Sequence, residues 1–500
     1  MREVASDSLY RAPSRQAGKA GEIFLMSQSP SQRTAALTKY SLTSRKSVPL
    51  LADLQAAAVS FNGDKFLYRQ GSRWGIASTA DTVKPGAGLL NMDAMQVLTV
   101  PREEWKQMYA EAWRIERSYF YASNYTGVNI DAAEKEYSRY LPGIASREDL
   151  NYLFREMLGK LSTGHTFVGG GDIPNPAPPN VGLLGADYSV ENGRYRFHTI
   201  YSGENWNPDL RAPLTEPGVA VKQGDYLLAV NGRELRGTDN VFSFFLNTAG
   251  EQITLRVGAN PNGANAHEIT VVPVASELDL RGRDWTFGNL RKIDQLSGGR
   301  IAYVYLPNTG NGGYTWFNRY FFAQVGKQAL IVDDRYNSGG QSADYIIQIL
   351  QRKLMNYWYT SNGEVSTEPA EAIFGPKVML INEYAGSGGD LIPWFFHHES
   401  IGTLVGKRTW GGEVGTTGYP ALIDGGLVTA PSIAFFSTEG KWGIENEGVP
   451  PDVEVAVDPA AWRKGHDEQL EKAVQLILDD LSKHPLPTPK VPAFPVYPQR

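Results

Sequence analysis

The segment from Asn382 to Asp390 places a serine between glycines, in the order Ala-Gly-Ser-Gly-Gly around Ser387. The apolar run 377–381 before it predicts a buried strand, and the apolar residues within 391–396 predict a helix after it. Glycines let the chain turn sharply at such a strand-to-helix corner and leave the serine hydroxyl open. The segment therefore predicts an α/β fold. Within it, Ser387 is either a nucleophile or the cap of an ordinary glycine-rich helix start.

A second glycine-rich corner comes earlier in the chain. The apolar run 329–333 predicts another buried strand, and Gly339 and Gly340 lie between it and a helix expected over about 342–354. Backbone N–H groups at such a glycine pair can point outward, as an oxyanion hole requires. Together with the N–H of Gly388, at the positive end of the next predicted helix, this corner would provide two donors.

The first 98 residues favour strands, because short apolar segments alternate with turn residues. The Asn62-Gly63 pair is a strong hairpin signal, since both residue types tolerate a positive φ. The stretch 59–68 resembles one blade repeat of a β-propeller, but only one or two blades are recognisable where a propeller needs about four. Residues 1–98 are interpreted either as a small β-subdomain or, preferably, as a partial propeller-like remnant. In the second case the chain would be the C-terminal part of a longer protein.

Residues 99–175 favour helices. A capping box at 146–149 is followed by apolar residues at steps of three and one, the spacing of a helix that faces a core. The break at 162–164 is expected to end that helix and leaves His165 at its edge. A single histidine at a helix end is most often structural. The break and the glycine run 169–171 that follows favour a functional role.

The remainder of the chain divides into three parts. After a proline-rich linker, residues 176–278 resemble a PDZ domain, with 182–185 at the position of the loop that binds a peptide carboxylate. The most specific match is 224–232, a strand followed by an Asn-Gly turn, although a generic β-module is the alternative. Residues 279–484 alternate strands and helices, as the βαβ units of a parallel sheet do. The proline-rich tail 485–500 is expected to be extended.

Composition excludes several classes of function. The net charge of −6 argues against nucleic acid or an anionic membrane as the main partner. No apolar run approaches the roughly 18 residues that span a bilayer. The absence of cysteine excludes disulfides, thiolate catalysis and cysteine-based metal sites. The seven histidines show no His-Glu-x-x-His pattern, so no metal site is expected.

The order of these parts is similar to that of the tail-specific peptidase superfamily, and most similar to its tricorn group. The motifs that carry the resemblance are Asp-x-Arg-x-Asn-x-Gly-Gly at 333–340, Ala-Gly-Ser-Gly-Gly-Asp at 385–390, and the runs 409–415 and 442–453. The resemblance covers about residues 99–480, plus the propeller-like remnant before them. It implies a multidomain α/β and β protein whose last domain, 279–484, is a crotonase/ClpP-like α/β catalytic domain.

The same resemblance implies an activity. Members of the group are serine peptidases, so this chain is expected to cleave peptides or unfolded polypeptides through an acyl-enzyme, without a metal or organic cofactor. Ser387 would be the nucleophile, and Gly388 with Gly339 or Gly340 would form the oxyanion hole. A homo-oligomer and a cytoplasmic location are also expected, with the periplasm as the alternative if an upstream signal is missing.

The resemblance also suggests which residue takes the proton from the serine. C-terminal processing peptidases of the superfamily use a lysine in a Thr-Phe-Gly-Lys-Gly motif, but the aligned position here is Gly412, and Lys407 precedes the motif. Tricorn peptidases use a histidine before the PDZ-like module, and His165 occupies that position. An imidazole suits this role because its pKa lies near the working pH. Glu445 matches the glutamate that supports this histidine, and a surface carboxylate is the alternative.

One member of the tricorn tetrad is missing. The serine directly before the histidine in tricorn peptidases is replaced here by Gly164. Ser162 or Thr163 could take over its relay role, a water could bridge, or the site could be weakened. This departure motivates a second hypothesis, a non-catalytic peptide-binding or scaffold protein on the same fold. The other three residues of the tetrad argue against it.

Overall fold

The computed structural model describes residues 14–28, 34–93, 95–176 and 178–498, and the chain divides into two compact units at Pro101. The first unit contains a four-stranded antiparallel sheet in the order β1-β2-β3-β4 and a three-stranded one in the order β5-β6-β7. These strands are β1 Ser14–Ala17, β2 Glu22–Gln28, β3 Ala35–Ser41, β4 Lys46–Leu54, β5 Ala56–Val59, β6 Lys65–Gln70 and β7 Arg73–Ser78. The expected Asn62-Gly63 turn lies between β5 and β6, where Gly63 has a φ of +73°.

The second unit begins with three helices: α1 Pro101–Tyr119, α2 Ile130–Ser138 and α3 Arg147–Gly159. The predicted capping box is present, because Ser146 and Asp149 bond reciprocally at the start of α3. The helix ends before the predicted break at 162–164. The chain then runs into the short strand β8, Val168–Gly169, which pairs with β22, Leu427–Val428. This pairing ties the helical region to a distant part of the chain.

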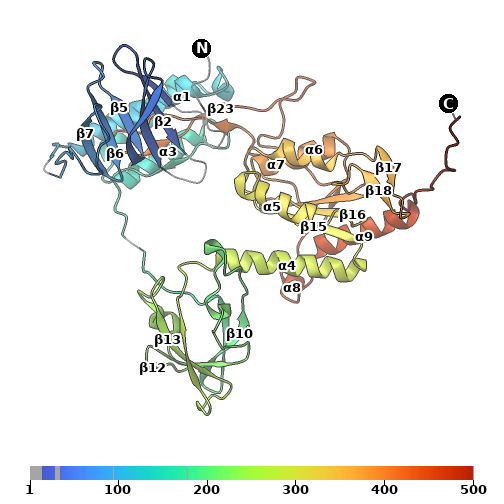
Figure 1. The fold of residues 1–500 in the computed structure, drawn as a ribbon. Helices are drawn as coiled ribbons and strands as arrows, with labels where there is room; N and C mark the ends of the chain where they lie inside the picture. The colour runs from blue at the N-terminus through green and yellow to red at the C-terminus, as the bar shows by residue number, and fades with distance from the viewer. Residues whose placement is uncertain (1–13, 29–33, 94, 177, 499–500) are drawn as a thin grey trace. The chain divides into compact units, whose positions relative to one another are not determined.

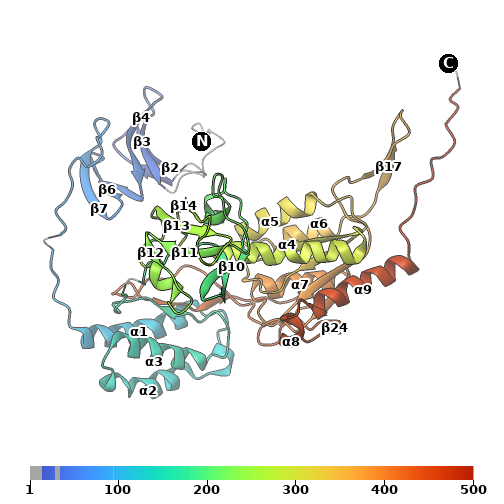
Figure 2. The ribbon, with the colours of Figure 1, turned by 90° about the horizontal axis from the view of Figure 1, so that it is seen from below.

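The PDZ-like module is one antiparallel sheet in the order β14-β13-β11-β10-β9, with β12 paired to β11 (Figure 2). Its strands are β9 Ala186–Glu191, β10 Arg194–Ile200, β11 Tyr226–Val230, β12 Arg233–Glu234, β13 Ile253–Gly258 and β14 His267–Val271. The predicted Asn-Gly turn joins β11 to β12, and both Asn231 and Gly232 have positive φ, as a type I′ turn requires. The strand and turn predicted at 224–232 are confirmed.

The last domain is built on a parallel sheet in the order β15-β16-β19-β20-β24. Its strands are β15 Ile301–Tyr305, β16 Ala329–Asp333, β19 Lys377–Ile381, β20 Thr403–Gly406 and β24 Val453–Glu454. Its helices are α4 Leu278–Ser297, α5 Asn311–Phe322, α6 Ala343–Leu350, α7 Gly388–His398, α8 Pro459–Trp462 and α9 Glu468–Lys483. The strand-helix alternation predicted from the sequence is present. The helix expected over 342–354 ends earlier, because its apolar stripe stops at Leu350 and the chain turns into the hairpin of β17 Asn356–Tyr359 and β18 Val365–Glu368.

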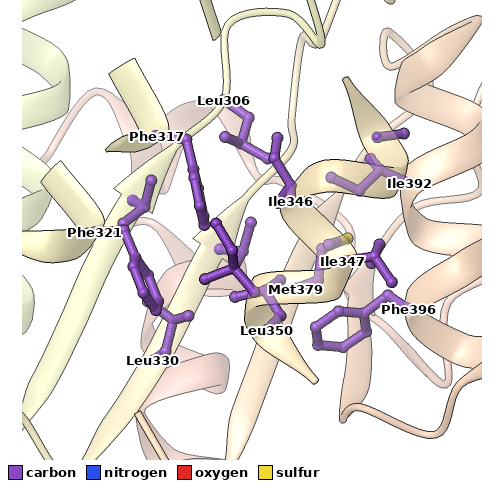
Figure 3. Close-up of a cluster of buried hydrophobic side chains, with 14 of the residues drawn as sticks. Leu306, Phe317, Phe321, Leu330, Ile346, Ile347, Leu350, Met379, Ile392 and Phe396 are labelled. Carbon is purple, nitrogen blue, oxygen red and sulfur yellow. The ribbon is translucent and has the colours of Figure 1, made fainter. Parts of the chain in front are cut away.

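The central strands of this sheet are buried on both sides, because successive side chains point to opposite faces. On one face, Leu330 and Met379 pack against α5, α6 and α7, as Figure 3 shows. On the other face, Ile331 and Val378 pack against α4 and α9. Figure 1 shows these two helices on the same side of the sheet. The two predicted glycine-rich corners follow the carboxyl ends of β16 and β19, which is where ligands bind in open parallel sheets. In the described part of the chain, every helix is too short or too polar to cross a bilayer.

Candidate active site

Ser387 occupies a strained corner between β19 and α7. Its φ of 57° and ψ of −123° differ from the extended conformation of an ordinary helix N-cap. The Ser387 N–H donates to Asp390 Oδ2 at 2.9 Å, and the same carboxylate accepts N–H groups from Gly411 at 2.8 Å and Gly412 at 2.9 Å. Asp390 thus holds the strained backbone to a neighbouring loop and leaves the serine side chain half-buried at the corner.

The second glycine-rich corner lies directly against the first. A Cβ built on Gly339 would lie 2.7 Å from the Cβ of Ser387, so no larger residue fits there. The Gly339 N–H already donates to Asn337 Oδ1 at 2.8 Å. A Cβ built on Gly388 would lie 2.8 Å from the nitrogen of Gly340. Among the described residues, no acceptor bonds the N–H of Gly340, and Gly388 begins a helix whose first N–H groups have no partner within it. These two N–H groups are therefore available as donors.

His165 lies in the loop after α3 and opens to the same cavity as Ser387, which has a volume of about 480 Å³. Its ring centroid lies 5.5 Å from that of Phe167 and 6.0 Å from that of Trp410. Its backbone carbonyl accepts from the Thr429 hydroxyl at 2.6 Å, and that hydroxyl accepts from the Phe167 N–H at 2.7 Å. The pairing of β8 with β22 extends this link, because β8 directly follows Phe167 and β22 directly precedes Thr429.

Burial lowers the pKa of His165 below its usual range, while the negative charges of Glu445 and Asp390 oppose the shift. The Nδ1 atom is buried, and no residue in the described ranges bonds it. The lowered pKa keeps the ring neutral at neutral pH. A neutral imidazole in a cavity with a serine can accept a proton.

Glu445 is half-buried, and its carboxylate accepts a hydrogen bond from the backbone of the loop that carries His165. One carboxylate oxygen accepts the Gly164 N–H at 2.6 Å, and the other accepts the N–H groups of Glu413 at 2.7 Å and Val414 at 3.0 Å. The carboxylate is therefore not a free surface group. It fixes the residue directly before His165 rather than the imidazole ring.

Gly164 stands where tricorn peptidases have a serine, and Ser162 and Thr163 are the candidates for the role of that serine. Gly164 lies outside the left-handed region of φ, and a Cβ built on it would lie 3.3 Å from Glu445 Oε1. The Thr163 hydroxyl is buried and has no partner among the described residues, and the exposed Ser162 contacts the carbonyl of Lys160 at 3.5 Å. Neither hydroxyl bonds the imidazole.

Trp410 was not singled out from the sequence, although it lies in a motif that carries the resemblance. Its backbone N–H donates to the Ala385 carbonyl at 2.9 Å. A Cβ built on Gly386 would lie 2.6 Å from its ring, and a Cβ built on Gly164 would lie 3.5 Å from its ring. The half-exposed indole therefore lies beside both the residue before Ser387 and the residue before the histidine.

Glu413 was also missed. It lines the cavity that contains Ser387 and a second cavity of about 330 Å³ beside Glu445. Burial, followed by the charges of Asp390 and Glu445, raises the pKa of Glu413 to about 9. Its position in the 409–415 motif was the only sequence signal that could have identified it.

Three family models match the chain: the tricorn protease C1 domain over residues 101–159, the tricorn protease PDZ domain over 182–276, and peptidase family S41 over 300–455. The chain therefore contains segments that match the C1 and PDZ domains of tricorn proteases and a segment that matches peptidase family S41. The resemblance inferred from the motifs is therefore confirmed, as is a mixed α/β architecture with PDZ and S41 peptidase domains.

Individual members of the tricorn group match over most of this chain. Tricorn protease homolog 1 of Streptomyces coelicolor is 35% identical over 399 residues, which are 79% of this chain and 37% of that protein. Tricorn protease of Thermoplasma acidophilum is 29% identical over 450 residues, or 89% of this chain and 41% of that protein. The crystal structure of the tricorn protease superposes with a TM-score of 0.86 at 26% identity, covering 95% of this chain and 46% of that one. This chain spans less than half the length of these relatives.

Proposed function

We propose that the chain is a serine peptidase that cleaves peptides or unfolded polypeptides through an acyl-enzyme. The observation that carries the proposal is that Ser387, at a strained and anchored corner, opens to the same cavity as the neutral imidazole of His165. The matches to peptidase family S41 and to tricorn proteases support the same activity. No metal or organic cofactor takes part in the proposed steps.

In the proposed mechanism, the Ser387 hydroxyl attacks the carbonyl carbon of the scissile bond while its proton passes to His165. The oxyanion accepts the N–H groups of Gly388 and Gly340, a type of interaction worth about 10²–10³ in rate per donor. The C–N bond then breaks as the imidazolium protonates the leaving amine. Water, deprotonated by the same imidazole, hydrolyses the acyl-enzyme and restores the serine.

Glu445 supports the base through the backbone in this proposal. Its carboxylate bonds the Gly164 N–H, and its charge favours the imidazolium that forms on His165. A relay through Ser162 or Thr163 is not needed for this role. The group differs from an ordinary Ser-His-acid triad, in which the acid bonds the imidazole itself.

The alternative, a non-catalytic peptide-binding or scaffold protein, is tested by a fluorophosphonate probe. The probe should label the wild-type protein stoichiometrically at Ser387, with modification mapped by mass spectrometry, and should not label Ser387→Ala. A wild-type protein that remains unlabelled while properly folded would favour the scaffold.

The resemblance supports three further parts of the proposal. Residues 1–98 would be a partial, propeller-like remnant, because the blades of a β-propeller are four-stranded antiparallel sheets like β1-β2-β3-β4. The last domain would have a crotonase/ClpP-like arrangement. The protein would form a homo-oligomer, whose mass light scattering coupled to gel filtration can measure. A cytoplasmic location is proposed independently of the resemblance.

A further inference from the structure

The loop 182–185 of the PDZ-like module already contacts a carboxylate. The Gly185 N–H donates to Glu277 Oε1 at 2.6 Å, and the Ala186 N–H approaches the same oxygen at 3.3 Å. Glu277 lies outside the module sheet, directly before α4, and its side chain is only 9% exposed. In a PDZ domain, this loop is where the backbone would bind the terminal carboxylate of a peptide.

The other end of the loop is paired as well. The Gly182 N–H donates to the Phe245 carbonyl at 2.9 Å. Leu183 and Val274 exchange two backbone hydrogen bonds, at 2.8 and 2.9 Å. The segment before Glu277 therefore runs alongside the loop, which places the glutamate beside Gly185.

The second oxygen of Glu277 continues into an ion-pair network. Glu277 Oε2 accepts from Arg281 of α4 at 3.0 and 2.7 Å. Arg281 donates in turn to Asp187 of β9 at 2.8 Å and to the Tyr201 hydroxyl at 3.0 Å, and its guanidinium lies 4.6 Å from the Tyr201 ring centroid. The glutamate thus joins the loop, the edge strand of the module and the first turn of α4.

We propose that Glu277 is an internal ligand of this carboxylate-binding loop. The module therefore holds α4 in position and does not bind the C-termini of peptides. A peptide would have to displace a carboxylate that belongs to the same chain. Such a tethered ligand has an effective concentration of at least the millimolar range, and a rigid, short tether increases it. The inference concerns the module alone and does not depend on peptidase activity.

Chemical rescue tests the carboxylate site in the full chain. Glu277→Ala should lower the Tm by several degrees, because it leaves the buried Gly185 and Ala186 N–H groups without their acceptor and removes one of the acceptors of Arg281. Acetate at about 100 mM should restore part of the loss. Acetamide and sodium chloride at the same concentration should not, because neither supplies a carboxylate. Glu268→Ala, at an exposed glutamate of β14, is the matched control and should show neither loss nor rescue.

Two results would overturn the proposal: an unchanged Tm in Glu277→Ala, or equal effects of acetate and chloride. If Glu277→Ala does not fold, Glu277→Gln provides the same test. Its amide oxygen can still accept the Gly185 N–H but carries no charge for Arg281, so its Tm should lie below that of the wild type. A wild-type Tm in Glu277→Gln would contradict the ion-pair network.

Peptide binding provides an independent test. Labelled peptides with a free C-terminus and their C-terminal amides can be compared by fluorescence anisotropy in the Ser387→Ala background, which prevents cleavage. Adding Glu277→Ala should increase the preference for the free acid over the amide by about tenfold or more. An unchanged preference across peptides with apolar, acidic and basic C-terminal residues would mean that Glu277 does not occupy a peptide-carboxylate site.

Discussion

Replacing Ser387 by alanine removes one hydroxyl and leaves the Asp390 anchor of the corner intact, because that anchor uses the backbone N–H. Peptide hydrolysis should fall to background, while stability should change by no more than about 0.5 kcal/mol. Fluorogenic peptide assays and thermal unfolding measure the two effects. Ser338→Ala, at an exposed serine of the adjacent corner, is the control and should retain activity. Hydrolysis near the wild-type rate in Ser387→Ala would identify another nucleophile.

The second residue-scale prediction concerns His165. His165→Ala should lower kcat by roughly 10²–10⁴, the usual contribution of a general acid-base. In the wild type, kcat/KM should fall as the pH falls through the folded pKa, because the protonated imidazole cannot accept a proton. Since burial lowers the pKa of His165, this acidic limb should lie below about pH 6.5. His198→Ala, at an exposed histidine of β10, should leave the limb unchanged. An active His165→Ala variant would place the base elsewhere.

Gly164 permits a test by addition. Its φ is compatible with any residue, and the Cβ of a serine there would point toward Glu445 Oε1. A hydroxyl that bonds this carboxylate should orient the loop before His165, so Gly164→Ser should raise kcat about fivefold, the effect of roughly 1 kcal/mol, with little change in KM. Gly164→Ala supplies the Cβ without the hydroxyl. Equal kinetics in the two variants would show that the hydroxyl has no role and that only the space matters.

At the scale of elements, Trp410 connects the nucleophile corner to the histidine loop. Trp410→Ala should lower kcat roughly 10- to 100-fold, because it removes the ring that contacts both loops and fixes the distance between them. It should also shift the acidic limb to higher pH, since the imidazole of His165 becomes better hydrated and its pKa rises toward the ordinary value. Trp410→Phe should recover part of both effects. The control is Trp358→Ala, an exposed tryptophan of the β17–β18 hairpin. A lower kcat with an unmoved limb would limit Trp410 to a general structural role.

The elements that could be predicted from the sequence are those that local patterns determine. Buried apolar runs followed by glycines specify β16, β19 and the two corners, because strand burial and tight turns depend on neighbouring residues. The bond from Gly164 to Glu445 joins residues 281 positions apart, and no local pattern encodes it. Helix ends were predicted less well than helix positions. Here α3 ends at Gly159, before the predicted break, and α6 ends at Leu350, where its apolar stripe stops.

For the whole molecule, the sequence indicates the order of the modules but not how they are joined. The PDZ-like module could be recognised from 224–232. The sequence of its loop at 182–185, however, is equally compatible with a peptide-binding role and with a scaffolding role. The distinction depends on Glu277, which lies about 90 positions further along and looks like an ordinary helix-start residue in the sequence. Folding brings that carboxylate to the loop.

Unfolding of the whole molecule should respond to one buried carboxyl in the helical region. Glu116 of α1 is fully buried, no residue in the described ranges bonds either of its carboxyl oxygens, and burial raises its pKa to about 8. The folded state therefore binds a proton that the unfolded state releases above about pH 4.3. The stabilisation from this group is complete below that pH and is lost as the pH rises to about 8, by at most about 1.4 kcal/mol per pH unit.

Glu116→Gln mimics the neutral carboxyl and should remove this dependence. Urea unfolding between pH 5 and pH 9 should show the variant gaining stability relative to the wild type as the pH rises. Glu156→Gln, at an exposed glutamate of α3, should run parallel to the wild type over the same range. A constant difference between Glu116→Gln and the wild type at every pH would mean that Glu116 is already ionised in the folded protein, and that water or a cation reaches a side chain that the packing of α1 encloses.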